Sequence, residues 1–259
     1  MTEQKARKAA RDGAELARAF VGRTGKHYTT ALIAAAGSST RMQASVSKQL
    51  LEVDGIPVLA RTLLAYQAAS TVQEIVLIAR REDFEQFHAM AVKYGITKLT
   101  RMTQGGSTRQ ESVRRGLRAV SPQTRFVAIA DGARCLITPK QIDAVNLTAY
   151  RTDAASAGYP VTDTVKIVDQ KRRTVDSPDR STVWLAQTPQ TFSLPLYRVA
   201  AYYAKENGYE ATDDNALVEN IGRRVTMVDC GKQNLKITTP EDIVIAQAIL
   251  ASRTKEELT

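Results

Sequence analysis

The chain has 259 residues, 43% hydrophobic and 24% charged, a composition typical of a globular protein with one sizeable core. It has no apolar run of membrane-spanning length, and its N-terminus lacks the apolar centre of a secretory signal, so we expect a cytoplasmic protein without a membrane partner. Two cysteines and two histidines argue against a disulfide framework, a multi-histidine metal site and a histidine-based catalytic triad.

Of the net charge of +9, +4 lies in residues 1–28, which hold seven basic and three acidic side chains, and +5 lies in the rest of the chain. Residues 1–28 are predicted to be a basic extension, helical or partly disordered, outside the main domain. A nucleotide- or nucleic-acid-binding protein that uses this basic tail is one alternative function. Because no basic stripe interleaved with aromatics occurs elsewhere, we expect no nucleic-acid partner.

From residue 29 onward, short apolar runs alternate with amphipathic stretches. Strands are predicted at Ala31–Ala35, Glu74–Ala79, Leu99–Thr103, Phe126–Ala130, Ala155–Val161 and Val225–Val228. Helices are predicted at Val58–Ala69, Arg81–Tyr94, Arg109–Ala119, Pro139–Ala149, Leu194–Lys205, Asp213–Asn220 and Pro240–Leu250. The alternation predicts an α/β fold with a Rossmann-like, doubly wound, mostly parallel sheet over residues 29–252, followed by a tail at 253–259.

A polar segment over about residues 164–184 interrupts this rhythm. Its centre holds Lys171-Arg172-Arg173, and β-favouring stretches at Val165–Val168 and Thr182–Trp184 flank it. The pattern predicts a protruding β-hairpin arm. Since such an arm has no core of its own, we expect it to pack on another subunit of a homodimer.

The end of the first strand carries a turn of small residues followed by two cations. Ala35, Ala36 and Gly37 let backbone N–H groups approach a polyanion, while Arg41 and Lys48 supply positive charge. The turn matches neither the dinucleotide-binding glycine pattern nor a Walker loop. It indicates a nucleoside triphosphate or another phosphorylated ligand.

An aspartate ends the apolar strand at Phe126–Ala130. In open α/β sheets, ligands bind beyond the carboxyl ends of strands, and an acidic side chain there can hold a divalent cation between phosphates. Asp131 is therefore a candidate metal ligand. On position alone, a turn or helix-capping aspartate is the alternative interpretation.

Several segments together resemble one enzyme family. They are Ala35-Ala36-Gly37-x-x-x-Arg41-Met42, Lys48-Gln49, Gly105-Gly106-x-x-Arg109-Gln110-Glu111-Ser112-Val113, Asp131-Gly132-Ala133-Arg134, Pro160-Val161-x-Asp163-Thr164-x-Lys166, Gln187-Thr188-Pro189-Gln190, Thr212-Asp213-Asp214 and Asn234-Leu235-Lys236-Ile237-Thr238-x-Pro240-Glu241-Asp242. In this order they resemble the 2-C-methyl-D-erythritol 4-phosphate cytidylyltransferases of isoprenoid biosynthesis. The resemblance implies attack by a phosphomonoester oxygen of methylerythritol phosphate on the α-phosphorus of CTP, with release of pyrophosphate.

The resemblance also implies a role for each matching residue. It makes Arg41, Lys48 and Lys236 the catalytic cations and Asp131 the Mg²⁺ ligand. The CTP-binding residues would be Ala35, Ala36, Gly37, Gly106, Ser112 and Gly132, with Gly106 and Ser112 reading the cytosine ring. A capped helix that starts near Ser107 would explain Gly106 and Ser112 by structure alone. The residues implied to hold the substrate phosphate are Arg134, Thr164, Arg180 and Thr188, with Lys236 also facing methylerythritol phosphate.

Two choices stay open at the level of sequence. The arm is longer between Val175 and Arg180 than the family pattern, so Arg172 or Arg173 is an alternative to Arg180. A cytidylyltransferase acting on D-ribitol 5-phosphate is the alternative enzyme, because its nucleotide half-site would be nearly the same. Ser39 and Ser47 depart from the glycine and proline of the family pattern and are expected to change loop stiffness without removing a charge.

Overall fold

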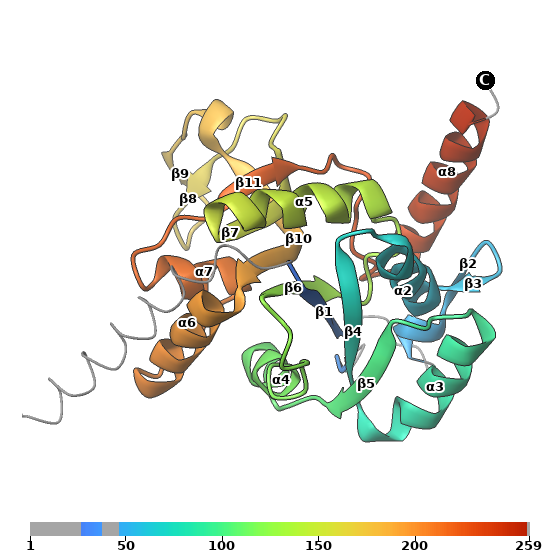
Figure 1. Cartoon of the computed structure of the whole chain (residues 1–259). Helices are drawn as coiled ribbons and strands as arrows, with labels where there is room; N and C mark the ends of the chain where they lie inside the picture. The colour runs from blue at the N-terminus through green and yellow to red at the C-terminus, as the bar shows by residue number, and fades with distance from the viewer. Residues whose placement is uncertain (1–26, 38–46, 258–259) are drawn as a thin grey trace, which may run out of the picture.

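The structure is a computed structural model that describes residues 27–37 and 47–257, without the side chains of Lys48 and residues 254–257 (Figure 1). Arg41 and Ser39 lie outside the described residues, as does all of the predicted basic extension except His27 and Tyr28.

One seven-stranded sheet organises the chain. Its strands are β1 (Thr29–Ala34), β4 (Val72–Ala79), β5 (Leu99–Gln104), β6 (Phe126–Asp131), β7 (Ala154–Pro160), β10 (Trp184–Ser193) and β11 (Thr226–Asp229). The order is β11-β7-β10-β6-β1-β4-β5, and only β10 runs antiparallel to its neighbours. The predicted α/β fold with a mostly parallel sheet is confirmed.

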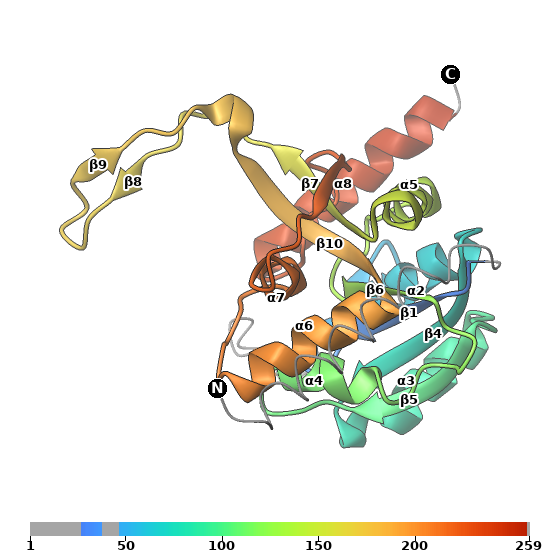
Figure 2. The ribbon, with the colours of Figure 1, turned by 60° about the vertical axis from the view of Figure 1, so that its left-hand side comes forward.

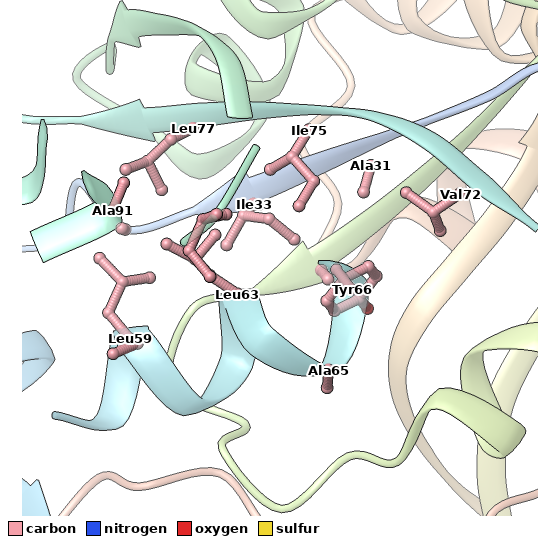
Figure 3. Close-up of a cluster of buried hydrophobic side chains, with 14 of the residues drawn as sticks. Ala31, Ile33, Leu59, Leu63, Ala65, Tyr66, Val72, Ile75, Leu77 and Ala91 are labelled. Atoms are coloured by element: carbon pink, nitrogen blue, oxygen red, sulfur yellow. The ribbon is translucent and has the colours of Figure 1, made fainter. Parts of the chain in front are cut away.

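Helices cover both faces of this sheet (Figure 1). They are α2 (Val58–Ala68), α3 (Phe84–Lys93), α4 (Arg109–Gly116), α5 (Pro139–Thr152), α6 (Leu194–Glu206) and α7 (Asp214–Glu219). The last helix, α8 (Pro240–Glu257), packs in a separate cluster with Val53, Val58 and Leu136. Strand β1 shows why two layers form. Ala31 and Ile33 pack in one buried cluster with α2 and α3 (Figure 3), whereas Leu32 packs in another with α4 and α6. Alternate residues of a strand face opposite sides, so both faces need cover.

Strand β10 is absent from the sequence-based prediction. Its sequence, Trp184 to Ser193, contains Gln-Thr-Pro-Gln, which reads as a polar loop, yet residues 187–193 are all buried. Its polar side chains form hydrogen bonds with residues that are distant in the sequence. For example, Gln187 accepts a hydrogen bond from Asn234 (3.0 Å), and Thr191 donates one to Asn146 (2.8 Å). Buried polar groups of this kind are paired as a rule.

A small hairpin, β2 (Glu52–Val53) with β3 (Ile56–Pro57), was also not predicted. Its turn residues, Asp54 and Gly55, have φ values of 48° and 71°. Asp-Gly is a preferred pair for this two-residue turn, so the signal was present in the sequence.

The last helix is longer than predicted. Pro240 begins α8, as expected, and Asp242 accepts hydrogen bonds from the backbone N–H groups of Thr238 and Thr239 (2.7 and 2.8 Å). The helix continues to Glu257, past the predicted end at Leu250 and into the predicted tail at 253–259. Arg253 donates to the carbonyl of Leu136 (2.8 Å) and so attaches this part of the helix to the domain.

The segment between β7 and β10 extends away from the sheet (Figure 2). It contains the short antiparallel strands β8 (Ile167–Val168) and β9 (Thr174–Asp176) and the 3-10 turn η4 (Arg180–Thr182). The two β-favouring stretches that flank the predicted arm, Val165–Val168 and Thr182–Trp184, do not pair with each other. Ile167–Val168 pairs with Thr174–Asp176, because a tight turn at Asp169–Arg173, with Arg172 at φ 61°, reverses the chain earlier, and Trp184 pairs with Pro160 in the main sheet.

Candidate functional site

A cavity of about 420 Å³ opens at the carboxyl ends of β1 and β6. Its wall is formed by Ala34, Ala36, Gly37, Gln49, Gly106, Ser107, Thr108, Arg109, Ser112, Asp131, Ala133 and Lys236. The carboxyl edge of a parallel sheet is where the sequence placed the site, and six of the predicted site residues line it. These are Ala36, Gly37, Gly106, Ser112, Asp131 and Lys236.

Asp131 lies within ion-pair distance of three cationic side chains. Its Oδ2 is 3.0 Å from Lys236 Nζ and 3.5 Å from Arg134 Nε, and its Oδ1 is 3.9 Å from Arg109 Nε. Burial alone would raise the pKa of Asp131, but Lys236, Arg109 and Arg134 outweigh burial and hold that pKa below its ordinary value. The carboxylate is therefore ionised and surrounded by positive charge.

The backbone around Asp131 is fixed from two sides. The Asp131 N–H donates to Thr188 Oγ1 (3.0 Å), and the Gly132 N–H donates to the carbonyl of Ala34 (2.9 Å). A Cβ on Gly132 would lie 3.1 Å from Leu59 Cδ1 and 3.2 Å from the Ala34 carbonyl oxygen. A small residue is needed here because strands β1 and β6 approach closely at their carboxyl ends.

Asn234 brings Arg134 and Lys236 to the site. It is fully buried, and its Nδ2 donates to Gln187 Oε1 and to the Thr188 carbonyl (both 3.0 Å). Arg134 donates to the Asn234 carbonyl (2.7 Å), so the segment leading to Lys236 is held between β10 and the end of β6. Burial lowers the pKa of Arg134 against the opposing effect of Asp131.

Gly106 and Ser112 bond to each other. The Gly106 N–H donates to Ser112 Oγ (2.9 Å), and Ser112 Oγ donates to the Thr108 carbonyl (2.8 Å). Helix α4 begins at Arg109, and its N-cap is Thr108, next to Ser107; the Thr108 side chain accepts a hydrogen bond from the Glu111 N–H (3.0 Å). The capped-helix interpretation thus holds, and both Gly106 and Ser112 also line the cavity.

The turn after β1 offers fewer free backbone N–H groups to a ligand than predicted. Ala35 is buried, and its N–H donates to the Ile78 carbonyl (2.7 Å), so this N–H serves the sheet rather than a ligand. Ala36 and Gly37 line the cavity. Lys48 begins the 3-10 turn η2 (Lys48–Leu50), directly beside the cavity residue Gln49.

The other predicted phosphate-binding residues do not line this cavity. Thr188 is buried and engaged with Asp131. Thr164 is exposed at the base of the arm, and Arg180 donates to the Thr162 carbonyl (3.1 Å). Arg173, an alternative to Arg180, is paired with Asp169 (2.8 Å) in the arm.

Six cavity residues had no assigned role in the sequence-based prediction, among them Arg109 and Gln49. Arg109 lies beside Asp131, and Gln49 is buried with no hydrogen-bond partner for Oε1 among the residues described. Both belong to segments that carried the resemblance, Gly-Gly-x-x-Arg and Lys-Gln. That position inside a motif was the available signal.

The donor set fits a magnesium ion that is bound jointly with substrate phosphates. Within residues 27–37 and 47–257, no group of three or more His, Cys, Asp or Glu side chains could form a metal cage. Mg²⁺ commonly uses one or two carboxylates together with substrate phosphates and water. Asp131 is the only carboxylate among the described residues of the cavity wall, and it could serve as that single ligand.

A mostly parallel α/β sheet with a cationic cavity at its carboxyl edge defines a class of proteins that bind phosphorylated ligands such as nucleotides. Residues 29–252 match the family model of 2-C-methyl-D-erythritol 4-phosphate cytidylyltransferase, IspD. The chain belongs to this family.

Individual relatives agree with this assignment. The chain is 42% identical over 222 residues to the 2-C-methyl-D-erythritol 4-phosphate cytidylyltransferase of Nostoc punctiforme, covering 86% of this chain and 98% of the relative. A crystal structure of 4-diphosphocytidyl-2C-methyl-D-erythritol synthase from Anaerococcus prevotii superposes with a TM-score of 0.78 at 29% identity, covering 87% of this chain and 97% of that one. The Thermus thermophilus cytidylyltransferase gives a TM-score of 0.68 at 31% identity, covering 85% and 97%.

Proposed function

We propose that the protein transfers the cytidylyl group of CTP to 2-C-methyl-D-erythritol 4-phosphate, forming 4-diphosphocytidyl-2-C-methyl-D-erythritol and pyrophosphate. The observation that carries this proposal is the cluster around Asp131, where Lys236, Arg134 and Arg109 surround one carboxylate at the cavity wall. Such a cluster offers both a metal ligand and fixed positive charge to a triphosphate.

In this mechanism the substrate's phosphomonoester oxygen attacks the α-phosphorus, and the bond to the pyrophosphate leaving group breaks. The reaction needs no covalent enzyme intermediate, so the protein's task is alignment and charge stabilisation. Lys236 Nζ stabilises charge that grows on the α-phosphate, and Arg134 supports it while fixing the segment of Asn234. Arg41 and Lys48 are assigned to the triphosphate by their positions in the motif.

Asp131 is the proposed Mg²⁺ ligand. When bound, the metal ion would neutralise charge on the triphosphate oxygens. Lys236 Nζ is 3.0 Å from Asp131 Oδ2, so the carboxylate that would hold the metal also positions this ammonium group at the cavity wall, where it faces the reacting phosphate. The base half-site is assigned to Gly106 and Ser112, and the phosphate-binding turn to Ala35, Ala36, Gly37 and Gly132.

The arm supports a homodimeric arrangement. Ile167, Val168 and Val175 are 47%, 49% and 62% exposed in the single chain, an unusual exposure for branched apolar residues. Pairing of two arms would bury these side chains and would bring Thr164 and Arg180 of one protomer toward the cavity of its partner. We assign the substrate phosphate to these two residues together with Thr188 and Arg134.

None of the described helices is long and apolar enough to cross a membrane. A cytoplasmic location is part of this proposal, since CTP and a polyol phosphate are small water-soluble substrates.

Pyrophosphate release measured with CTP, UTP, ATP and GTP, each with methylerythritol phosphate, tests the proposal. We expect turnover with CTP that needs added Mg²⁺ and is lost with a chelator. Turnover with a purine nucleotide in preference to CTP would contradict the assigned base half-site. Metal-independent turnover would remove Asp131 from its proposed role.

A further inference from the structure

Arg109 links the cavity to a carboxylate that is not part of the cavity wall. Its Nη1 is 2.6 Å from Asp214 Oδ2, whereas its Nε is 3.9 Å from Asp131 Oδ1. The Arg109 side chain is 30% exposed and lines the cavity, but the Asp214 side chain is only 1% exposed. The Arg109 guanidinium therefore forms a close ion pair with the buried Asp214 carboxylate and only a long one with Asp131 at the cavity wall.

Asp214 is held in place by hydrogen bonds with residues outside the cavity wall. Its Oδ1 accepts a hydrogen bond from the hydroxyl of Tyr197, a fully buried residue of α6. Its backbone N–H donates to Gln190 Oε1 (2.8 Å), which fixes the start of α7 on strand β10. Thr188, two residues before Gln190 on the same strand, accepts a hydrogen bond from the backbone N–H of Asp131 through its hydroxyl oxygen. Strand β10 thus sets the positions of both carboxylates.

We propose that Asp214 and Tyr197 are positioning residues for CTP that act through Arg109. They hold the guanidinium at the cavity wall, where its remaining N–H donors face the bound nucleotide, and they keep it from closing onto Asp131. This inference rests on the proposed use of CTP. It extends that proposal because neither Asp214 nor Tyr197 touches the cavity.

The charges explain why such an anchor matters. An arginine carries five N–H donors in a fixed planar fork, so orienting one edge of the fork orients the others. Without Asp214, the nearest remaining carboxylate for Arg109 is Asp131, which already pairs with Lys236 and Arg134. A third close cation there would compete with the substrate and its metal for the same oxygens.

The Arg109–Asp214 pair also has a purely structural interpretation, in which it joins α4 to α7. Breaking a buried ion pair by removing one partner usually destabilises a protein. The structural interpretation predicts lower thermal stability and nothing specific to CTP. The positioning role predicts, in addition, a loss of CTP affinity that disappears when Arg109 is absent.

The test is the dissociation constant of CTP measured by calorimetry on the full chain, without polyol phosphate. We expect Asp214→Asn and Arg109→Gln each to weaken CTP binding about tenfold or more, the scale of a lost hydrogen bond to a charged group. The double variant should bind no more weakly than Arg109→Gln alone. In turnover, KM for CTP should rise while KM for methylerythritol phosphate stays at the parental value.

Asp83→Asn is the matched control, because Asp83 is buried and pairs with the partly exposed Arg80 (2.8 Å), and neither residue lines the cavity. It should keep parental CTP affinity. If Asp214→Asn fails to fold, Tyr197→Phe carries the test, since it removes only the hydroxyl and should weaken CTP about threefold or more.

If Asp214→Asn binds CTP with the parental affinity, the inference is overturned. If Asp214→Asn does not fold, parental CTP affinity in Tyr197→Phe overturns it. An added loss of affinity in the double variant overturns it as well. A wild-type chain that binds no CTP overturns the proposed function itself, so the two failures are distinguishable.

Discussion

The wall of the cavity and the hairpin arm are organised in opposite ways. At the cavity, Asp131 is fixed through its backbone by Thr188 and through its carboxylate by three cations, and its side chain is 12% exposed. In the arm, Arg173 pairs with Asp169 (2.8 Å) and Lys166 donates to Ser177 (2.8 Å), so these side chains contact the arm itself, and the Arg173 side chain is 72% exposed.

The contrast separates two kinds of binding residue. Those at the cavity are already held in place by one chain, so we assign CTP to them. Those on the arm lie away from the cavity of their own chain, so we assign the polyol phosphate to them as residues contributed across the proposed dimer. Variants should follow this division, with losses in kcat and nucleotide binding at the cavity and losses in polyol binding in the arm.

The largest effect is expected for Asp131→Asn. Removing the carboxylate takes away the proposed metal ligand and leaves Lys236 and Arg134 without their partner. We expect kcat to fall about a hundredfold or more in the pyrophosphate assay, and the Mg²⁺ concentration for half-maximal rate to rise. Asp143→Asn is the control, because Asp143 accepts hydrogen bonds from Ser70 and Thr71 outside the cavity. A parental metal response in Asp131→Asn would refute the ligand assignment.

Lys236→Ala should follow closely. Lys236 lines the cavity and gives the shortest of the three ion pairs with Asp131. Losing one fixed charge at the transition state costs roughly 3 to 4 kcal/mol, so turnover should drop about a hundredfold or more. Lys48→Ala is expected to behave in the same way. Lys232→Ala, whose exposed ammonium only bonds Thr162 (2.8 Å), is the control and should keep parental turnover. Equal losses of turnover in Lys236→Ala and Lys232→Ala would show that overall positive charge, rather than the position of Lys236, determines the rate.

A smaller and more selective effect is expected in the arm. Arg180→Ala should raise KM for the polyol phosphate about tenfold and leave KM for CTP unchanged, since one charged contact to phosphate is lost. Arg173→Ala should have little effect because Asp169 already occupies that guanidinium. The reverse ranking in steady-state kinetics would move the role to Arg173, and Arg172→Ala tests the third candidate.

Acid should weaken the cavity cluster. The pKa of Asp131 is lower in the folded protein than its ordinary value, so the cluster contributes stability above about pH 4 and loses that contribution as the pH falls through the folded value. Thermal unfolding from pH 7 to pH 3 should show the wild type and Asp131→Asn converging in Tm. Parallel curves over that range would show that the ion pairs add no net stability.

Deleting residues 1–27 should have the smallest effect. The proposed chemistry uses none of them, and the nucleic-acid alternative assigns the function to them. We expect unchanged CTP-dependent turnover and an unchanged Tm. Loss of turnover in a folded truncated chain would show that the basic segment contributes to the site.

The buried parallel strands β1, β4 and β6 could be predicted because each is an apolar run of the right length. Strand β10 could not, since its polar residues are buried only by virtue of partners such as Asn146 and Asn234, which are distant in the chain. For the same reason the motifs gave Asp131 and Lys236, but not the anchoring of Arg109 by Asp214. Periodicity reports local burial, whereas hydrogen-bond satisfaction between segments depends on the finished fold.

The most direct test of the account is a competition assay in which one tube contains CTP, Mg²⁺ and equal concentrations of methylerythritol 4-phosphate and D-ribitol 5-phosphate. The ratio of the two cytidine diphosphate products gives the ratio of kcat/KM for the two polyols. We expect 4-diphosphocytidyl-2-C-methyl-D-erythritol to be the dominant product and pyrophosphate to form in an amount equal to the sum of the two products. Preferential formation of the ribitol product would contradict this expectation.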